Sequence, residues 1–295
     1  MSEKTAEQQA DGRWSAPAVE RRVGLSSDEF LDEYVSEGRP VVIPNAVDSW
    51  DAMGKWTPEW FGNNYGDLRI AGADGPTLAE VVAAIDDDSL DSNYYARNLS
   101  LTELDSQLLA DVSPLPEHVT ADNWLRSRLL PALPRERFGG ELFIAPVEMR
   151  YPYLHWDGSH VHANFFMIHG TKEIALFNPD QSNWLYPVPG ATKVNHRSDI
   201  NDVYDPDLDR FPLYEKAQGT LVTIEPGDHL FIPGGWWHTV RSPTPSISIV
   251  VKMANASNWP AVQDDFPQRF RERSLGRVVS SVYLRGVGAW LGRRS

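Results

Sequence analysis

The chain has 295 residues, a formal net charge of −14 and no cysteine. These numbers exclude disulfides, thiolate nucleophiles, iron–sulfur clusters and Cys-ligated zinc, so any bound metal must be held by His, Asp or Glu. The acidic balance argues against nucleic acid as a partner, because phosphates would be repelled. The sequence contains no run of about 18 apolar residues, so no membrane span is predicted. The polar N-terminus shows no signal peptide, and we expect a cytoplasmic protein.

The first 138 residues predict mixed structure. Residues 1–22 are polar and predict a flexible leader. A short helix follows, with Ser26 or Ser27 as its N-cap, and it ends at Gly38. The further elements predicted in this part are a buried strand over 39–44, a helix over 77–86, an extended segment over 93–99 and a helical stretch around 124–130.

After residue 138 the sequence pattern changes to short runs rich in β-forming residues, separated by Pro, Gly, Asn and Asp. Many short strands at such spacing indicate a sandwich or barrel. A long polar insert over 195–216 interrupts them, and we expect it to be either functional or loose. The predicted strands cover 141–145, 153–157, 163–169, 173–177, 220–225, 229–232, 238–241 and 247–253.

The C-terminal segment differs in charge from the rest of the chain. Residues 266–295 contain seven Arg and one Glu, a balance of +6. Apolar residues between the arginines predict one amphipathic helix, or two, over 266–291. Such a helix could join two copies of the chain, or contact a membrane surface or an acidic partner.

One short motif carries the candidate chemistry. In a strand, side chains two residues apart share a face, so His155 and Asp157 of the sequence His-Trp-Asp point the same way. His238, 83 residues after His155, could complete the set from another strand. Two His and one carboxylate with open positions form the facial triad of non-haem Fe(II) oxygenases. The His-x-Asp pair alone is equally compatible with an ordinary structural role, as a partly exposed His and an Asp in a turn.

Several separated motifs occur in the same order as in one known family. They lie in Asn164–Asp180, Trp184–Pro187 and Pro226–His238. Together they resemble the Jumonji-C branch of the Fe(II)/2-oxoglutarate oxygenases, also described as cupin-like domains. The pattern is most similar to the asparaginyl hydroxylase that modifies hypoxia-inducible factor. The resemblance extends from about Leu25 to Met253.

The resemblance implies a fold and a domain organisation. The fold would be mainly β with flanking helices, built around a double-stranded β-helix (a cupin-like jelly-roll). The catalytic domain would span 23–260, with a helical and strand part to about 138 and the jelly-roll core over 139–254. The Arg-rich helical segment 261–295 would follow.

The resemblance also carries roles onto matching residues. His155, Asp157 and His238 would bind Fe(II), and Lys172, Tyr95 and Asn164 would bind 2-oxoglutarate. A buried ammonium needs an anion, which agrees with the role of Lys172. Two positions depart from the family pattern, since Pro152 stands where relatives have Thr, and Lys252 where they have Asn. Weaker candidates are Tyr94 and Lys252 for 2-oxoglutarate, and Trp156, Arg97, His162, Trp184 and the insert for the substrate.

The implied activity is hydroxylation of an unactivated C–H bond with Fe(II), 2-oxoglutarate and O2, yielding succinate and CO2. Steering by the acidic surface favours a neutral or basic partner. We therefore expect the β-carbon of an amino-acid side chain in a peptide, a peptide natural product or a protein. A free amino acid or another small molecule is an alternative substrate. Two other classes stay open: a non-catalytic cupin-like binding module, and a Zn- or Mn-dependent cupin isomerase.

Overall fold

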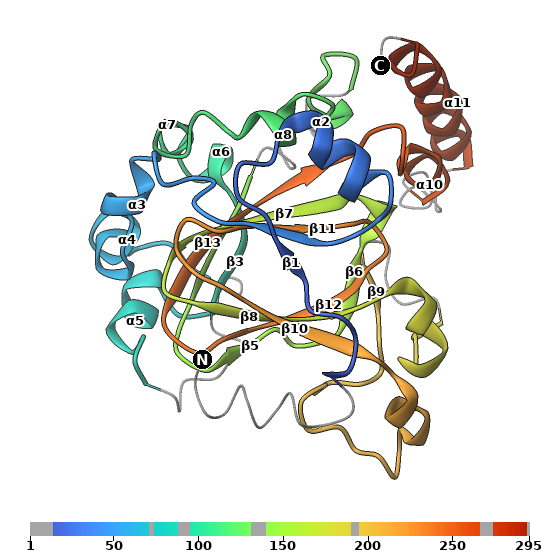
Figure 1. The fold of residues 1–295 in the computed structure, drawn as a ribbon. Coiled ribbons are helices and arrows are strands. Elements are labelled where there is room, and N and C mark those ends of the chain that lie inside the picture. The colour runs from blue at the N-terminus through green and yellow to red at the C-terminus, as the bar shows by residue number, and fades with distance from the viewer. Residues whose placement is uncertain are drawn as a thin grey trace.

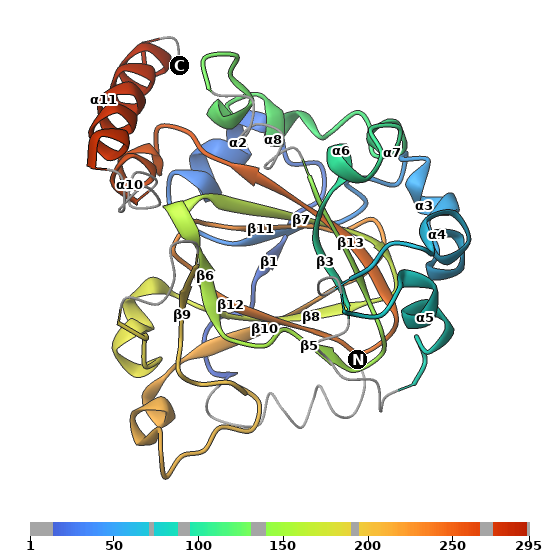
Figure 2. The same ribbon diagram turned by 180° about the vertical axis from the view of Figure 1, so that it is seen from behind.

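The computed structural model describes residues 14–70, 74–87, 95–130, 140–189, 195–265 and 274–293. Two β-sheets face each other at its centre, and helices cover the outside (Figures 1 and 2). One sheet has seven strands in the order β1-β2-β11-β7-β13-β4-β3, and the other has six, β10-β8-β12-β6-β9 with β5 paired to β12. Apart from the parallel pair β1–β2, the strands pair antiparallel, which is the jelly-roll core that the sequence predicts.

The strand positions follow the apolar runs of the sequence. Each of the eight strands predicted after residue 138 has a counterpart in the structure. The strands are β1 (Glu20–Arg21), β2 (Val41–Ile43), β3 (Ala96–Ser100), β4 (Glu141–Ala145), β5 (Met149–Arg150), β6 (His155–Asp157), β7 (His162–His169), β8 (Lys172–Phe177), β9 (Asn195–Arg197), β10 (Gly219–Ile224), β11 (His229–Ile232), β12 (Trp237–Ser242) and β13 (Ser246–Met253).

The helices are short and lie mostly before the core. Ser26 caps the first in a capping box with Glu29, as the sequence predicts. The α-helices are α2 (Ser27–Phe30), α3 (Ala52–Lys55), α4 (Pro58–Tyr65), α5 (Leu78–Ala83), α6 (Leu101–Leu104), α7 (Leu108–Asp111), α8 (Glu117–Thr120), α10 (Trp259–Asp265) and α11 (Ser274–Leu291). Shorter turns are the π-helix η2 (Leu31–Val35) and the 3-10 helices η3 (Trp124–Arg126), η4 (Gly158–His160), η5 (Pro179–Trp184) and η6 (Pro212–Lys216).

A layer of helices covers the outer face of the seven-stranded sheet. Trp56 and Phe61 of this layer are buried, and Trp50 packs on Phe166 of β7 with ring centroids 5.2 Å apart. Figures 1 and 2 show α3 to α7 on this side of the sheet. Because the inner face of the same sheet meets the second sheet, β13 is buried along its whole length. The central strands therefore read as continuous apolar runs.

Two expectations from the sequence are corrected. Within the predicted leader, residues 14–22 pack on the core: Trp14 is buried, and Arg21 Nη2 lies 2.7 Å from Asp228 Oδ2. The stretch around 124–130 forms only the single turn η3, because the backbone leaves the helical conformation at Ser127 (φ −64°, ψ 137°). Residues 1–13 lie outside the described part of the chain.

The insert over 195–216 is not loose. Its strand β9 pairs with β6, and it contributes Ile200, Val203, Phe211 and Tyr214 to a buried cluster. These apolar residues are spaced among aspartates, which makes the segment look polar in sequence although it carries its own core.

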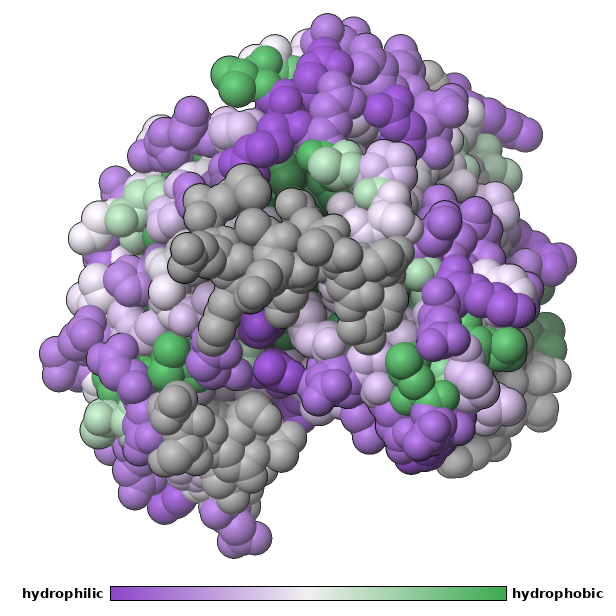
Figure 3. All heavy atoms as spheres, turned by 60° about the horizontal axis from the view of Figure 1, so that its bottom comes forward, coloured by the Kyte–Doolittle hydropathy of each residue, from purple (hydrophilic) through white to green (hydrophobic). Residues whose placement is uncertain are grey.

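The C-terminal helix α11 packs on α10 through Leu284 and Val287, and Trp259 Nε1 donates to the carbonyl oxygen of Leu284 at 3.2 Å. In the described ranges, no helix has both the length and the apolar character to cross a membrane. Figure 3 shows the face at the bottom of Figure 1, where hydrophilic residues predominate and apolar side chains form small separate patches.

Candidate active site

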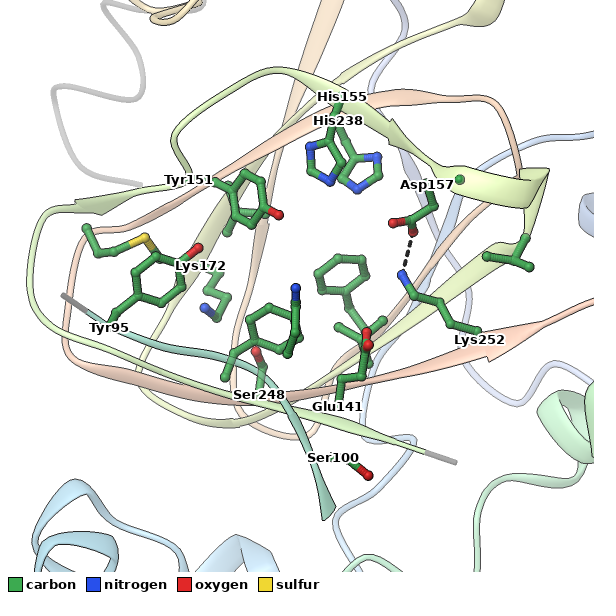
Figure 4. A pocket seen from close by; sticks show the side chains of 18 of the residues that line it. Tyr95, Ser100, Glu141, Tyr151, His155, Asp157, Lys172, His238, Ser248 and Lys252 are labelled. Atoms are coloured by element: carbon green, nitrogen blue, oxygen red, sulfur yellow. Dashed lines mark hydrogen bonds and ion pairs between the residues drawn. The ribbon is translucent and has the colours of Figure 1, made fainter. Parts of the chain in front are cut away.

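A cavity of about 360 Å³ lies between the two sheets. The seven-stranded sheet contributes Phe143, Phe165 and Val250 to its wall, and the other sheet contributes His155 and His238. Figure 4 shows the two imidazoles next to each other at one side, with the Asp157 carboxylate pointing into the same space. The cavity is therefore polar at its ends and apolar along its wall, as in many small-molecule sites.

The sheet register brings three candidate metal ligands together. His155 and Asp157 lie two residues apart on β6, and His238 of β12 stands directly opposite His155. One ligand atom from each of the three lies within 4.8 Å of the others. Among the described residues, this is the His, Asp and Glu group that could hold a metal ion. The predicted triad is thus assembled by strand pairing alone.

Backbone carbonyls fix the orientation of both imidazoles. Nδ1 of His155 lies 3.4 Å from the carbonyl oxygen of Tyr153, and Nδ1 of His238 lies 3.1 Å from that of Trp236. A carbonyl only accepts, so Nδ1 carries the proton and donates. This leaves the unprotonated Nε2 of each ring available to a metal.

Burial prepares the ligands electrostatically. It lowers the pKa of His155 to about 3 and also lowers the pKa of His238, so both rings are neutral. Burial alone would raise the pKa of Asp157, but the Lys252 ammonium beside it holds that pKa below its usual range. Two neutral imidazoles and one carboxylate form the protonation state that metal binding requires.

Another part of the cavity holds a buried cation. Lys172, at the start of β8, is 2% exposed, and its Nζ lies 3.4 Å from Ser242 Oγ. No carboxylate of the described residues pairs with this ammonium, and burial lowers its pKa to about 7. Tyr95 is also buried, and burial raises its pKa to about 12, so its hydroxyl stays protonated. Both side chains line the cavity.

Lys252, a weaker candidate for 2-oxoglutarate, also lines the cavity, but it contacts the metal-site carboxylate. Its Nζ lies 2.5 Å from Asp157 Oδ2, and both side chains are largely buried (Figure 4). Tyr94, the alternative to Tyr95, lies outside the described residues.

Two predicted site residues face away from the cavity. Asn164 is fully buried in the core, where its Nδ2 donates to the carbonyl oxygen of Val251 at 3.0 Å and its Oδ1 accepts from His229 Nε2 at 3.0 Å. On β7 its neighbour Phe165 lines the cavity, so Asn164 must point to the opposite face. His162, the first residue of β7, is buried outside the cavity lining, where Gly234 N donates to its Nδ1 at 2.9 Å.

The other substrate candidates also lie outside the cavity lining. Trp156 stacks on His196 with centroids 3.8 Å apart, on the side of β6 opposite the metal ligands. Trp184 packs in the cluster under the insert, with the Lys216 ammonium over its ring. The guanidinium of Arg97 lies over the rings of Tyr95 and Tyr151, behind the residues that line the cavity.

The sequence reading missed several residues of the cavity. Tyr151 stacks on His155 at 4.6 Å, and Ser248 and Glu141 lie on the seven-stranded sheet. The alternation of β13 could have revealed Ser248, because it shares a face with Lys252 four residues later. No comparable signal marks Tyr151.

Comparison with known proteins agrees with this geometry. A family model described as the cupin-like domain matches residues 77–253, more than half of the chain. The chain belongs to the cupin-like family. Three relatives show which branch. The lysine-specific demethylase JMJ21 of Arabidopsis thaliana is 26% identical over 88% of this chain. The tRNA wybutosine-synthesizing protein 5 of Mus musculus is 27% identical over 76% of it. The JmjC domain-containing protein D of Dictyostelium discoideum is 27% identical over 76%.

These relatives place the chain in the Jumonji-C branch, which supports an oxygenase-type function that depends on iron and 2-oxoglutarate. The aligned stretch spans 74% of the wybutosine-synthesizing protein, 53% of protein D and only 28% of the demethylase. Similarity to the demethylase therefore covers a minor part of that protein.

Proposed function

We propose that the protein is an Fe(II)- and 2-oxoglutarate-dependent dioxygenase that hydroxylates an unactivated C–H bond, with residues 23–260 as its catalytic domain. One observation carries the proposal. A single cavity joins a cluster of two His and one Asp to a buried lysine that has no carboxylate partner among the described residues. The cluster suits a divalent cation, and the lysine suits an anion.

His155, Asp157 and His238 fit the iron. Their donor set matches the facial triad of non-haem Fe(II) sites, and three ligands on one side leave other positions open. The hydrogen bonds from Nδ1 to backbone carbonyls hold each imidazole in one tautomer. The protein therefore supplies a rigid set of ligands without any rearrangement of the strands.

Lys172 and Tyr95 fit the distal carboxylate of 2-oxoglutarate. The Lys172 ammonium has donors to spare beyond its 3.4 Å contact with Ser242 Oγ. The Tyr95 hydroxyl lies beside the Arg97 guanidinium, which only donates, so the O–H has no acceptor among the described residues. A carboxylate between these groups would satisfy both donors. The donors proposed for 2-oxoglutarate are thus Lys172 and Tyr95, without Asn164.

Held by these residues, iron and 2-oxoglutarate would supply the activation of dioxygen, with one oxygen atom entering a substrate C–H bond and the other entering succinate as CO2 is released. The chain contributes position and environment. Phe143, Phe165 and Val250 form an apolar wall that limits water, and the fixed imidazoles hold the reacting centre in place.

As substrate we propose an amino-acid side chain in a peptide or protein, oxidised at its β-carbon. The net charge of −14 favours a neutral or basic partner, and Glu103 and Glu141 line the cavity on the side of β3 and β4. A free amino acid or other small molecule is the alternative. A binding module without catalysis is disfavoured because it needs neither the complete triad nor Lys172, and a Zn or Mn isomerase gives no reason for Lys172.

The experiment is succinate formation from 2-oxoglutarate with added Fe(II) in air, without a prime substrate. We expect slow turnover in the wild type, none in His155→Ala, and a much higher 2-oxoglutarate requirement in Lys172→Ala. Peptides are then screened for a product heavier by one oxygen atom. Absence of turnover, together with absence of metal-dependent 2-oxoglutarate binding without air, would contradict the proposal.

We further propose that α11 joins two copies of the chain. Its outer face exposes Val278, Val279, Val282 and Trp290, each more than 40% accessible. Several exposed large apolar side chains on one helix are typical of an interaction surface, and the +6 balance of residues 266–295 complements the acidic remainder. Light scattering coupled to gel filtration should give twice the mass of one chain. The variant Val282→Asp should give a monomer, whereas a monomeric wild type would rule the dimer out.

A further inference from the structure

We propose that Ser248 is a third donor to the distal carboxylate of 2-oxoglutarate and thereby selects a dicarboxylate over a shorter oxo acid. This inference rests on the proposed function. Ser248 is fully buried, lines the cavity, and its Oγ has no hydrogen-bond partner among the described residues. A buried hydroxyl without a partner costs free energy, so its presence beside a cavity points to a ligand.

The fold brings Ser248 to the end of the cavity that holds Lys172. The turn between β7 and β8 meets the turn between β12 and β13, where Thr171 N donates to Thr244 Oγ1 at 2.9 Å. Lys172 begins β8 directly after the first turn, and Ser248 lies two residues into β13 after the second. Figure 4 shows Tyr95, Lys172 and Ser248 on the same side of the cavity, away from Asp157.

The neighbouring serines do not compete for this role. Ser246 Oγ donates to Ser242 Oγ at 3.0 Å, and Ser242 Oγ accepts from Lys172 at 3.4 Å. The hydroxyls of Ser242 and Ser246 are thus linked to each other and to Lys172. Of these three serines on β12 and β13, Ser248 is the one that lines the cavity. The seven-stranded sheet fixes its position, because Ser248 pairs with Met167 of β7 and Phe143 of β4.

The donor count fits the ligand. A carboxylate offers two oxygens and about four acceptor sites. The Lys172 ammonium, the Tyr95 hydroxyl and the Ser248 hydroxyl supply donors from three elements: β8, the residue before β3, and β13. An oxo acid without a distal carboxylate would leave all three donors unsatisfied. Ser248 therefore contributes to specificity as well as to affinity.

The test is calorimetric titration of the full-length Mn(II)-loaded protein with 2-oxoglutarate and, in competition, with 2-oxobutyrate, which lacks the distal carboxylate. We expect Ser248→Ala to weaken 2-oxoglutarate binding about 10- to 100-fold, as for a hydrogen bond to a charged group. Its affinity for 2-oxobutyrate should not change. The matched control is Ser159→Ala, which removes another buried hydroxyl that has no partner among the described residues and lies outside the cavity lining.

Thermal stability gives a second readout. Removing an unpartnered hydroxyl should leave the melting temperature of the 2-oxoglutarate-free protein unchanged or higher, whereas a purely structural role would lower it. The inference is overturned if Ser248→Ala binds 2-oxoglutarate within twofold of the wild type, or weakens both oxo acids equally. In either case Lys172→Met should still lose 2-oxoglutarate binding, which keeps the proposed function. A wild type that binds no 2-oxoglutarate would overturn both.

Discussion

Lys252 Nζ lies 2.5 Å from Asp157 Oδ2, so the carboxylate of the candidate metal site is also one half of a buried ion pair. The two side chains are 10% and 14% exposed, which leaves little water to screen them. A bound divalent cation would share this carboxylate with the ammonium. Lys252 thus stabilises Asp157 in the metal-free protein and opposes the charge of the metal.

We therefore predict opposite effects of Lys252→Met on folding and on metal binding. Without the ammonium, Asp157 is a buried charge without a partner, and the metal-free protein should lose about 3 kcal/mol of stability. Without the competing ammonium, the free energy of Mn(II) binding to the Asp157 carboxylate becomes more favourable. Mn(II) should therefore raise the melting temperature of the variant by more than it raises that of the wild type. Lys252→Arg, which keeps the charge, is the control. Equal metal-induced shifts in wild type and Lys252→Met would show that the ammonium does not compete.

The buried Lys172 predicts how 2-oxoglutarate affinity depends on pH. Because burial lowers its pKa to about 7, the ammonium of the free protein loses its proton as the pH rises above that value. A carboxylate binds the charged form, so the affinity should fall about tenfold per pH unit above pH 7. Titrations of the Mn(II)-loaded protein between pH 6 and 9 measure this slope. Lys172→Arg, if it binds, should show a flat profile, and a flat wild-type profile would argue against Lys172 as the carboxylate ligand.

Substitution of Asn164 should lower the folding stability without changing cosubstrate binding. Its amide donates to the carbonyl oxygen of Val251 and accepts from His229 Nε2, so Asn164→Ala leaves two buried groups without partners. We predict a loss of about 2–4 kcal/mol in the free energy of unfolding. Because Asn164 does not line the cavity, 2-oxoglutarate affinity should stay within twofold of the wild type. Urea denaturation measures the stability and calorimetry measures the affinity. A large loss of 2-oxoglutarate affinity in a folded Asn164→Ala variant would indicate that Asn164 does bind the cosubstrate.

The buried histidines predict acid sensitivity. Burial lowers the pKa to about 4 for His118 and to about 3 for His155 and His162, against an ordinary value of 6.5. Between these limits the unfolded chain binds more protons than the folded one, so stability falls as the pH drops from about 6.5 toward 4. Each such histidine contributes up to about 1.4 kcal/mol per pH unit. His118→Gln should reduce the measured slope by about that amount, whereas an unchanged slope would mean that His118 does not titrate on unfolding.

The sequence predicts the core well because buried β-strands appear in it as short runs of apolar residues. Runs such as 163–169 and 247–253 are mainly apolar on both faces, since one face meets the helical layer and the other meets the second sheet. The spacing of His155 and Asp157 likewise places both side chains on one face without knowledge of the fold. The third member, His238, follows only once motifs on both strands are considered together.

The errors in the sequence prediction arise where the strand register sets the direction of a side chain, or where the tertiary structure sets the local conformation. Asn164 lies next to cavity residues in sequence, but alternation along β7 turns it to the other face. The stretch around 124–130 has helical composition, yet the backbone becomes extended at Ser127 and only the single turn η3 forms. Ser248 stands out only once the structure shows that its hydroxyl has no partner in the described part of the chain.

The pairing of β9 with β6 has a mechanical consequence for the candidate metal centre. β6 has only three residues, and two of them are the proposed ligands His155 and Asp157. β12 lies on one side of it and β9 on the other, so β6 is an interior strand instead of a frayed sheet edge. A deletion within 195–216 that removes β9 would expose an unpaired backbone ladder at the site. Loss of this neighbouring strand, which does not itself line the cavity, would then favour edge-to-edge association of chains as well as loss of the metal.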